Sequence, residues 1–214
     1  MNLLLASQSP RRRELLALLG LPFETTVTDV DEEPRAGESP AALVTRLSQA
    51  KARAAAAHAN AAIVACDTVV ALDGEILGKP RDEDEATAML RRLRGRPHVV
   101  YSGIALLETP TGREATMVSE TQLAMRAYSD AEIAAYVASG DPLDKAGAYA
   151  IQHAGFHPVA ELRGCYANVM GLPLCHLTRC LRNLGIEPPH DVPAACQAHT
   201  GRHCAVHTII LNDR

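Results

Sequence analysis

The chain has 214 residues, enough for one compact domain or for two lobes that share one cleft. Hydrophobic residues make up 47% of it and charged residues 21%, as in ordinary globular proteins, while the aromatic content of 3% leaves the core to Ala, Leu, Val and Ile. The net charge of −4 argues against a protein that coats nucleic acid, so any polyanion that it binds should be small and met by local cations.

The predicted elements begin with a short strand and a capped helix. Residues 2–6 form an apolar run that is typical of a buried strand. Ser9 then supplies an N-cap, and Pro10 occupies the first helical position of a helix that ends at Gly20. The acidic residues 24–37 follow as a loop or an edge strand.

A long helix and a β-hairpin come next. The same signal, a serine followed by a proline, opens an Ala-rich helix over residues 41–59. Residues 61–72 have the composition of a strand, and an Asp-Gly turn joins them to residues 75–77. This hairpin indicates that at least part of the sheet is antiparallel.

The rest of the body alternates helices and strands. Residues 82–94 predict a helix whose acidic first turn and basic last turn suit the helix dipole. Residues 98–108 and 114–128 predict two strands, and residues 131–140 and 171–185 predict two helices. Because strands and helices interleave without strict βαβ regularity, we predict an α/β fold with a mixed twisted sheet and flanking helices.

The composition changes after residue 186. Residues 187–214 are rich in Pro, His and Cys, so we predict a domain over residues 1–186 followed by an atypical C-terminal tail that is expected to be disordered. The tail also contains Cys and His residues at spacings that resemble those of metal ligands: Cys196, His199, His203, Cys204 and His207. A zinc-binding tail is therefore an alternative to incidental composition.

The cellular location is predicted from the absence of export signals. No apolar run approaches the roughly 20 residues of a membrane span, and the cations near the N-terminus follow the apolar stretch instead of preceding it. The six cysteines show no framework spacing. We expect a protein of the reduced cytoplasm with no membrane partner.

The first predicted helix carries the wrong charges for its position. Arg11, Arg12 and Arg13 crowd an N-terminus whose dipole favours anions, at a cost of several tenths of a kcal/mol each. A bound anion would resolve this conflict, with Ser7 and Ser9 as further hydroxyl donors. A solvated basic turn is the alternative, but a turn that directly follows a buried strand lies where α/β sheets bind ligands.

Asp67 is the second anomaly, because it interrupts the apolar strand 61–72. A carboxylate in such a place has a raised pKa or is held by a cation or a metal, unless it pairs with backbone donors at a strand end. Lys51 is a candidate cation, since it continues the stripe of Leu43 and Leu47 at helical spacing, although its ammonium group could also reach solvent.

Two further charged residues are candidates for the same site. Lys79 follows the predicted hairpin at the point where the chain returns towards Asp67, although its surroundings are not a P-loop. Glu32, in the acidic loop, is a plausible second metal ligand. Mg²⁺ prefers one or two carboxylates together with water and phosphate oxygens, which suits Glu32 with Asp67.

Taken together, these segments resemble the Maf family of nucleoside triphosphate pyrophosphatases. The resemblance extends over about residues 2–186 and is carried, in the order of the family, by LASQSPRRRELL (5–16), VDEEPR (30–35), LSQAKARA (47–54), CDTVVALDGEILGKPRD (66–82), SGIAL (102–106), DPLDKAGAYAIQ (141–152) and NVMGLPL (168–174). It implies two lobes around a central cleft, as in Maf and ITPase-like folds.

The resemblance also implies a reaction and a set of site residues. The reaction is metal-dependent attack of water at the α-phosphorus, with Mg²⁺ or Mn²⁺ as cofactor, which releases pyrophosphate and the nucleoside monophosphate. The implied roles are phosphate binding by Ser7, Arg11 and Arg12, charge neutralisation by Lys51 and Lys79, metal binding by Glu32 and Asp67, and proton acceptance by Asp67. The expected partner is a small nucleotide, and a homodimer is an option.

The substrate branch is implied by similarity as well. Arg11, Thr68 and Gln152 resemble the branch that cleaves dTTP and UTP, whereas the branch acting on 7-methyl-GTP typically has Gln in place of Thr68 and Glu in place of Gln152. A neutral amide can both donate to and accept from a pyrimidine edge. A nucleotide-binding regulator without catalysis is the rival function, because the arginines and lysines would serve it without Asp67.

Overall fold

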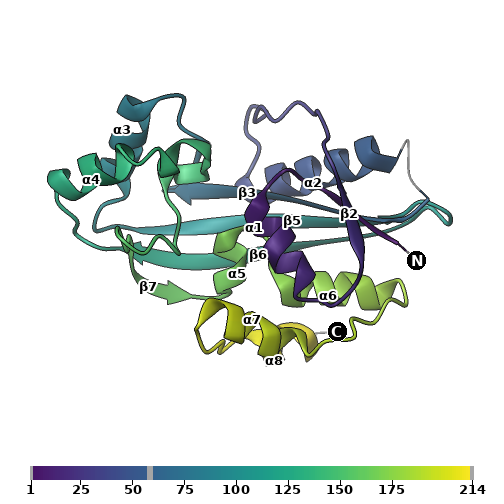
Figure 1. The fold of residues 1–214 in the computed structure, drawn as a ribbon. Helices are drawn as coiled ribbons and strands as arrows, with labels where there is room; N and C mark the ends of the chain where they lie inside the picture. The colour runs from purple at the N-terminus through teal and green to yellow at the C-terminus, as the bar shows by residue number, and fades with distance from the viewer. Residues whose placement is uncertain (1, 57–59, 213–214) are drawn as a thin grey trace.

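The computed structural model describes residues 2–56 and 60–212, which form one mixed sheet with helices on both faces (Figure 1). The strand order is β2-β1-β3-β5-β6-β7, with β4 paired to β3 outside this path. The strands are β1 (Leu3–Ala6), β2 (Phe23–Thr26), β3 (Ala62–Leu72), β4 (Glu75–Leu77), β5 (Pro97–Glu108), β6 (Arg113–Met125) and β7 (Val159–Arg163). Strand β1 runs parallel to β2 and β3, and the other pairs are antiparallel. The predicted α/β class with a mixed sheet is confirmed.

The helices lie on both faces and at one end of this sheet. They are α1 (Pro10–Ala17), α2 (Pro40–Ala56), α3 (Glu83–Leu93), α4 (Asp130–Val137), α5 (Tyr166–Met170), α6 (Leu174–Asn183), α7 (Val192–Thr200) and α8 (His207–Asn212), with short 3₁₀ turns at Asp141–Asp144 and Ala146–Ala148. Helix α2 packs on β3 and β5, whereas α5 and α6 pack on β5 and β6 from the other side (Figure 1).

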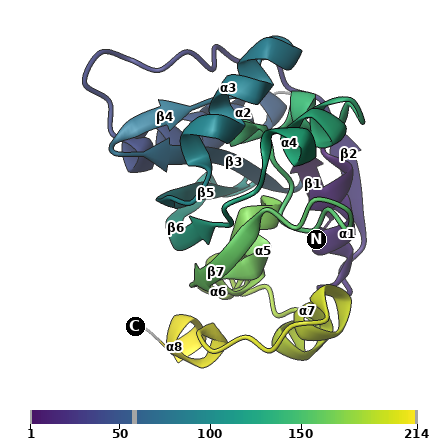
Figure 2. The same ribbon diagram turned by 90° about the vertical axis from the view of Figure 1, so that its left-hand side faces the viewer.

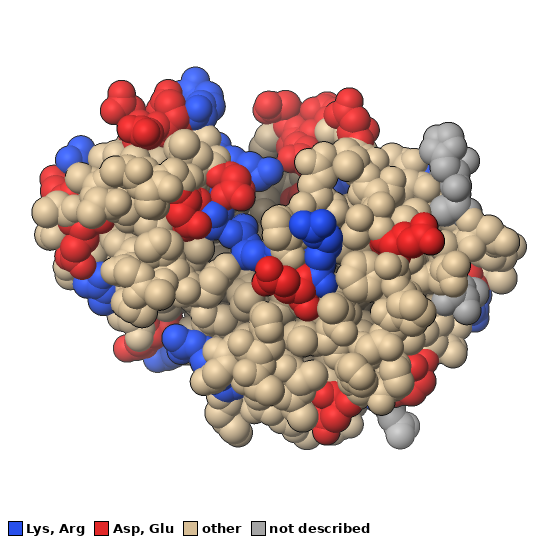
Figure 3. Space-filling model, in the orientation of Figure 1, with Lys and Arg blue, Asp and Glu red and all other residues tan. Residues whose placement is uncertain are grey.

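A charged hollow divides the molecule in the view of Figure 3. It lies between the part that contains α3 and α4 and the part that contains α1 and α2, and Lys, Arg, Asp and Glu side chains gather around it. This arrangement corresponds to the two lobes and central cleft that the family resemblance implies. In the part of the chain that the structure describes, no helix is long and apolar enough to cross a membrane.

Strand β3 forms the middle of the sheet, and its pairing with β5 depends on a glycine. Asp67 of β3 lies opposite Gly103 of β5 in the antiparallel register. A Cβ atom on Gly103 would meet the carbonyl oxygen of Val44, in α2, at 2.2 Å. The missing side chain therefore lets α2 approach the sheet beside Asp67.

The C-terminal segment differs from the expectation of a disordered tail. Residues 192–200 and 207–212 are helical, and Figure 2 shows them against the underside of the body. Val192 is only 3% exposed and belongs to the main core cluster, against which Cys196 and Val206 also pack. Asp191 caps α7 by accepting a hydrogen bond from a backbone N–H. These apolar contacts and this cap outweigh the Pro- and His-rich composition.

Other differences from the sequence prediction are small. Strand β7 and helix α5, of five residues each, were not predicted. The predicted helix 41–59 is present as α2 up to Ala56, and residues 57–59 lie outside the described residues.

We expect Gly103→Ala to destabilise the fold by about 1–3 kcal/mol, because the added methyl group meets backbone atoms of α2 that cannot rotate away. Urea unfolding of the purified variant measures this change. Gly78→Ala is the matched control, since nothing lies within 4 Å of a Cβ atom there, and its effect should stay within about 0.5 kcal/mol. Equal stability of the two variants would contradict the close approach of α2.

Candidate active site

The first part of the site is built at the start of α1. Pro10 begins the helix, and the Ser9 hydroxyl caps it by accepting a hydrogen bond from the backbone N–H of Arg12. The first turn contains no acidic residue. The strand-helix junction that the sequence predicts is therefore confirmed, including its conflict between three arginines and the helix dipole.

Arg12 is held by three oxygen atoms from three separate segments. Its Nε donates to the Gly171 carbonyl at 2.8 Å, Nη2 donates to Thr68 Oγ1 at 3.2 Å, and Nη1 donates to Ser7 Oγ at 3.5 Å. All three partners are neutral. The guanidinium group is thus oriented while its positive charge remains for an anion such as phosphate.

The second part of the site is an ion cluster around Lys51. Its Nζ lies 2.6 Å from Asp67 Oδ1 and 2.6 Å from Glu32 Oε1. Lys51 is 8% exposed and Asp67 7%, whereas the Glu32 side chain is 53% exposed. The sequence left open whether the buried carboxylate of Asp67 is held by a cation. The structure shows that it is, because Lys51 points inwards and forms an ion pair with Asp67.

The same cluster acts on the acidity of Glu32. Burial alone raises the pKa of the Glu32 carboxyl. The hydrogen bond and charge of Lys51 oppose this effect, and together with the charges of Lys79 and Arg12 they hold that pKa below its usual value. Lys79, although exposed, is thereby placed within electrostatic range of Glu32.

The donor set of this cluster fits a divalent cation. Two carboxylates share the single ammonium group of Lys51, which occupies Oδ1 of Asp67 and Oε1 of Glu32 and leaves the second oxygen of each for another cation. Within residues 2–56 and 60–212, no three Asp, Glu, His or Cys side chains are grouped to bind a metal ion. An ion at Glu32 and Asp67 would therefore complete its shell with water and phosphate oxygens, as Mg²⁺ prefers.

The segment that contains Lys79 is tied by a backbone hydrogen bond to the turn at residues 144–147. The backbone N–H of Gly147 donates to the carbonyl of Gly78 at 2.9 Å. Lys145 is buried and forms ion pairs with Asp141 at 2.9 Å and with Asp144 at 2.6 Å. The charged turn at 144–147 thus supports the chain next to Lys79.

Thr68 belongs to a hydroxyl network beneath Arg12. Its Oγ1 lies 2.8 Å from Ser102 Oγ, and that Ser102 hydroxyl also lies 3.3 Å from the backbone carbonyl of Asn168. Asn168 is itself fully buried and donates to the Val100 carbonyl. Thr68 is therefore oriented by Ser102 of β5, which is itself hydrogen-bonded to Asn168 of α5.

Two of the predicted residues stand apart from these contacts. Gln152 is exposed in the loop before β7, and its amide forms no hydrogen bond within the described residues. Arg11 is half-buried, and its charge acts on Tyr136 of α4, where burial raises the pKa of the phenol and Arg11 slightly opposes that rise. The structure thus brings Ser7, Arg12 and Thr68 together, and Glu32, Lys51 and Asp67 together.

Comparison with known proteins assigns this chain to a family. The family described as "Maf-like protein" matches residues 2–184. The chain belongs to the Maf-like family.

Two relatives of this Maf-like chain carry the same name. A protein of Myxococcus xanthus named dTTP/UTP pyrophosphatase is 51% identical over 189 residues, covering 87% of this chain and 94% of that protein. A protein of Salinibacter ruber with the same name is 52% identical over 182 residues, covering 84% of this chain and 89% of that protein. A solved dITP/XTP pyrophosphatase of Mycobacterium abscessus is more distant, with 21% identity, a TM-score of 0.43, and coverage of 86% and 98%.

Sequence reasoning missed three residues that shape the site of this Maf-like chain: Gly103, Ser102 and Gly171. A glycine inside the strand pattern of β5 signals a close backbone approach, so Gly103 could have been found. The contact of Gly171 with Arg12 joins residues 159 positions apart through a backbone carbonyl. Such a contact has no signature in the residue types.

We expect Lys51→Met to raise the pKa of Glu32, because burial would then act against fewer opposing charges. Titration of ¹³C-labelled glutamate carboxyls by NMR measures this shift. Lys79→Met is the control and should give a smaller rise, since Lys79 acts on Glu32 through its charge alone.

The same ion pair predicts a pH dependence of stability. Because the folded-state pKa of Glu32 is depressed, its stabilising contribution is present above the usual carboxyl pKa and is lost as the pH falls through the folded value. The stability difference between wild type and Lys51→Met should therefore shrink on acidification. A difference that grows would contradict the ion pair.

Proposed function

We propose that this Maf-like protein hydrolyses dTTP and UTP to the nucleoside monophosphate and pyrophosphate. The observation that carries the proposal is that one site contains two features. Arg12 is held by neutral oxygen atoms, and Lys51 forms an ion cluster with Asp67 and Glu32. Relatives that are 51–52% identical carry the name of this activity. The site chemistry suits a substrate with several phosphate groups, and the name supplies the substrate class.

The triphosphate would be bound from the α1 side of the hollow. Arg12 is held there by neutral oxygen atoms, and Ser7 and Arg11 lie on the same strand-helix junction. Lys51 and Lys79 would neutralise further phosphate charge from the side of β3 and β4. Because these cations come from different elements, the phosphate chain would be held along its length and not at one end.

The hydrolytic step would use Asp67 as the proton acceptor. An ionised carboxylate held by Lys51 can accept the proton of a water molecule placed beside the α-phosphorus, and the bond to pyrophosphate then breaks. A Mg²⁺ or Mn²⁺ ion held by Glu32 and Asp67 would supply Lewis-acid stabilisation of the phosphoryl oxygens. The ion pairs with Lys51 would keep the carboxylates of Asp67 and Glu32 oriented towards the metal ion.

The base would be recognised at some distance from this chemistry. The hydroxyl of Thr68 already forms hydrogen bonds with Arg12 and Ser102. We therefore propose that Thr68 mainly positions the guanidinium group of Arg12. Gln152 is exposed, its amide forms no hydrogen bond with the residues that the structure describes, and it is the better candidate for contact with the pyrimidine edge. The cytoplasmic location and the homodimer remain predictions.

Asp67→Asn should lower kcat by at least the roughly 10²–10⁴-fold that a general base contributes, because the amide cannot accept the proton and binds metal poorly. A continuous assay of pyrophosphate release with dTTP measures this loss. Isothermal titration with a non-hydrolysable dTTP analogue is the control and should show retained binding. Near-normal turnover would exclude Asp67 as the catalytic centre, and a wild-type protein that binds nucleotide without turnover would favour the regulator.

Substrate preference tests the base contact. We expect dTTP and UTP to be the best substrates and CTP to be weaker by roughly 5- to 150-fold in kcat/KM, since its amino group replaces the O4 acceptor. Gln152→Glu should depress dTTP and UTP cleavage, because a carboxylate cannot donate to O4. Measured kcat/KM values for dTTP, UTP, CTP, GTP and 7-methyl-GTP decide this; a preference for 7-methyl-GTP would overturn the substrate branch while leaving the pyrophosphatase activity intact.

A further inference from the structure

The position of Arg12 depends on a helix that is too short to be stable by itself. Of the three acceptors of Arg12, the Gly171 carbonyl forms the shortest hydrogen bond, at 2.8 Å. Gly171 is the C-cap of α5 and has a φ of 111°, which favours glycine. Helix α5 has five residues and no side-chain hydrogen bond at its N-cap, so packing must hold it in place.

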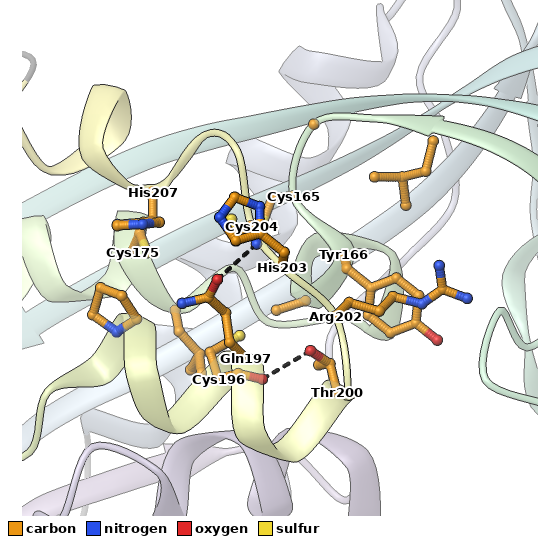
Figure 4. A pocket seen from close by; sticks show the side chains of 15 residues that line it. Cys165, Tyr166, Cys175, Cys196, Gln197, Thr200, Arg202, His203, Cys204 and His207 are labelled. Carbon is orange, nitrogen blue, oxygen red and sulfur yellow. Dashed lines mark hydrogen bonds between the residues drawn. The ribbon is translucent and has the colours of Figure 1, made fainter.

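The C-terminal segment provides packing for α5. We name residues 187–212 the C-terminal strap. The guanidinium carbon of Arg202 lies 4.8 Å from the centre of the Tyr166 ring, a cation–π contact with the first residue of α5. In Figure 4 the Arg202 side chain lies against this ring. Helix α7 of the strap also packs against α5 and α6.

A cavity beside the contact between the strap and α5 contains four thiols. Its volume is about 320 Å³, and its lining includes Cys165 and Cys175 from the body and Cys196 and Cys204 from the strap (Figure 4). Burial raises the pKa of Cys165 and Cys175 to about 12 and that of Cys196 to about 11. These three thiols are therefore protonated at neutral pH and act as small apolar side chains.

The strap also contacts the end of α1, the helix that carries Arg12. His190 donates from Nδ1 to the carbonyl of Leu18, the C-cap of α1, at 3.1 Å. A Cβ atom on Gly20 would meet the His190 ring at 2.6 Å, so the glycine leaves room for the imidazole. The strap therefore contacts both helices that the hydrogen bond between Arg12 and Gly171 joins.

We propose that the C-terminal strap is a positioning element for the phosphate site, in which Arg202 and His190 hold α5 and α1 so that the Gly171 carbonyl orients Arg12. The family match ends at residue 184, so this device is an addition to the family domain. Arg202 and His190 act through the two helices and do not touch the substrate. The consequence for turnover rests on the proposed function, whereas the consequence for Arg12 does not.

The first test observes Arg12 directly in the full-length protein. The Nε–H signal of Arg12 in ¹⁵N-edited NMR spectra should be protected from solvent exchange in wild type, and its exchange should become several-fold faster in Arg202→Ala and in His190→Ala. Both side chains are exposed, so neither variant threatens the core. Tyr166→Phe keeps the ring and should behave as wild type. Unchanged exchange in both alanine variants overturns the proposal.

The second test uses kinetics with matched controls. Arg202→Ala should raise the KM for dTTP by roughly 2- to 5-fold, the equivalent of one exposed cation–π contact, with little change in kcat. Arg202→Lys should restore most of this loss. Arg163→Ala and His199→Ala remove an exposed cation of β7 and an exposed imidazole of α7, and should change nothing.

The outcomes separate the two proposals. A rise in the KM of the control variants as well would overturn the proposed role of the strap. The effect would then follow from the loss of any exposed charged or imidazole side chain and not from Arg202 in particular. If wild type releases no pyrophosphate from any nucleotide, the proposed function fails, and Arg12 exchange together with calorimetric binding of inorganic tripolyphosphate still decides the strap. Equal tripolyphosphate affinity in wild type and Arg202→Ala, with unchanged exchange, would overturn it.

Discussion

One ammonium group, that of Lys51, sets the geometry of the candidate active site around Asp67 and Glu32. It is buried between two carboxylates, and an unpaired charge at this depth would cost several kcal/mol. Helix α2, strand β3 and the loop that contains Glu32 must therefore meet at one point. The glycine opposite Asp67 permits this meeting, because it lets the backbone of α2 lie against β5.

The two principal cations of the site are held in opposite ways. Lys51 is paired with two carboxylates, so its ammonium group orients Asp67 and Glu32. The hydrogen-bond partners of Arg12 in the described structure are neutral oxygens, so its charge stays available to an anion. A site that must attract phosphate and also keep carboxylates in place needs both arrangements.

The sequence predicted those features that violate a local rule. Asp67 interrupts an apolar strand, Lys51 continues an apolar helix face, and the arginines of α1 oppose its dipole; the structure confirms that the first two meet. The hydrogen bond between Arg12 and Gly171 could not be predicted, because a carbonyl at position 171 looks like any other. The prediction of a disordered tail was wrong because it relied on the overall composition of residues 187–214. It took no account of the cap at Asp191 or of the burial of Val192.

Helix α1 shows why support from outside the family domain would be useful. It has eight residues, cations at its N-terminus and no acid in its first turn, so its intrinsic stability is low. Burial of Leu15 and Leu16 packs one face of the helix against the main core. Acidic residues in the first turn would stabilise α1 and would also neutralise the arginines of the proposed phosphate site. Holding the far end of the helix with His190 avoids this conflict, since the contact with Leu18 lies at the opposite end of α1 from Arg12.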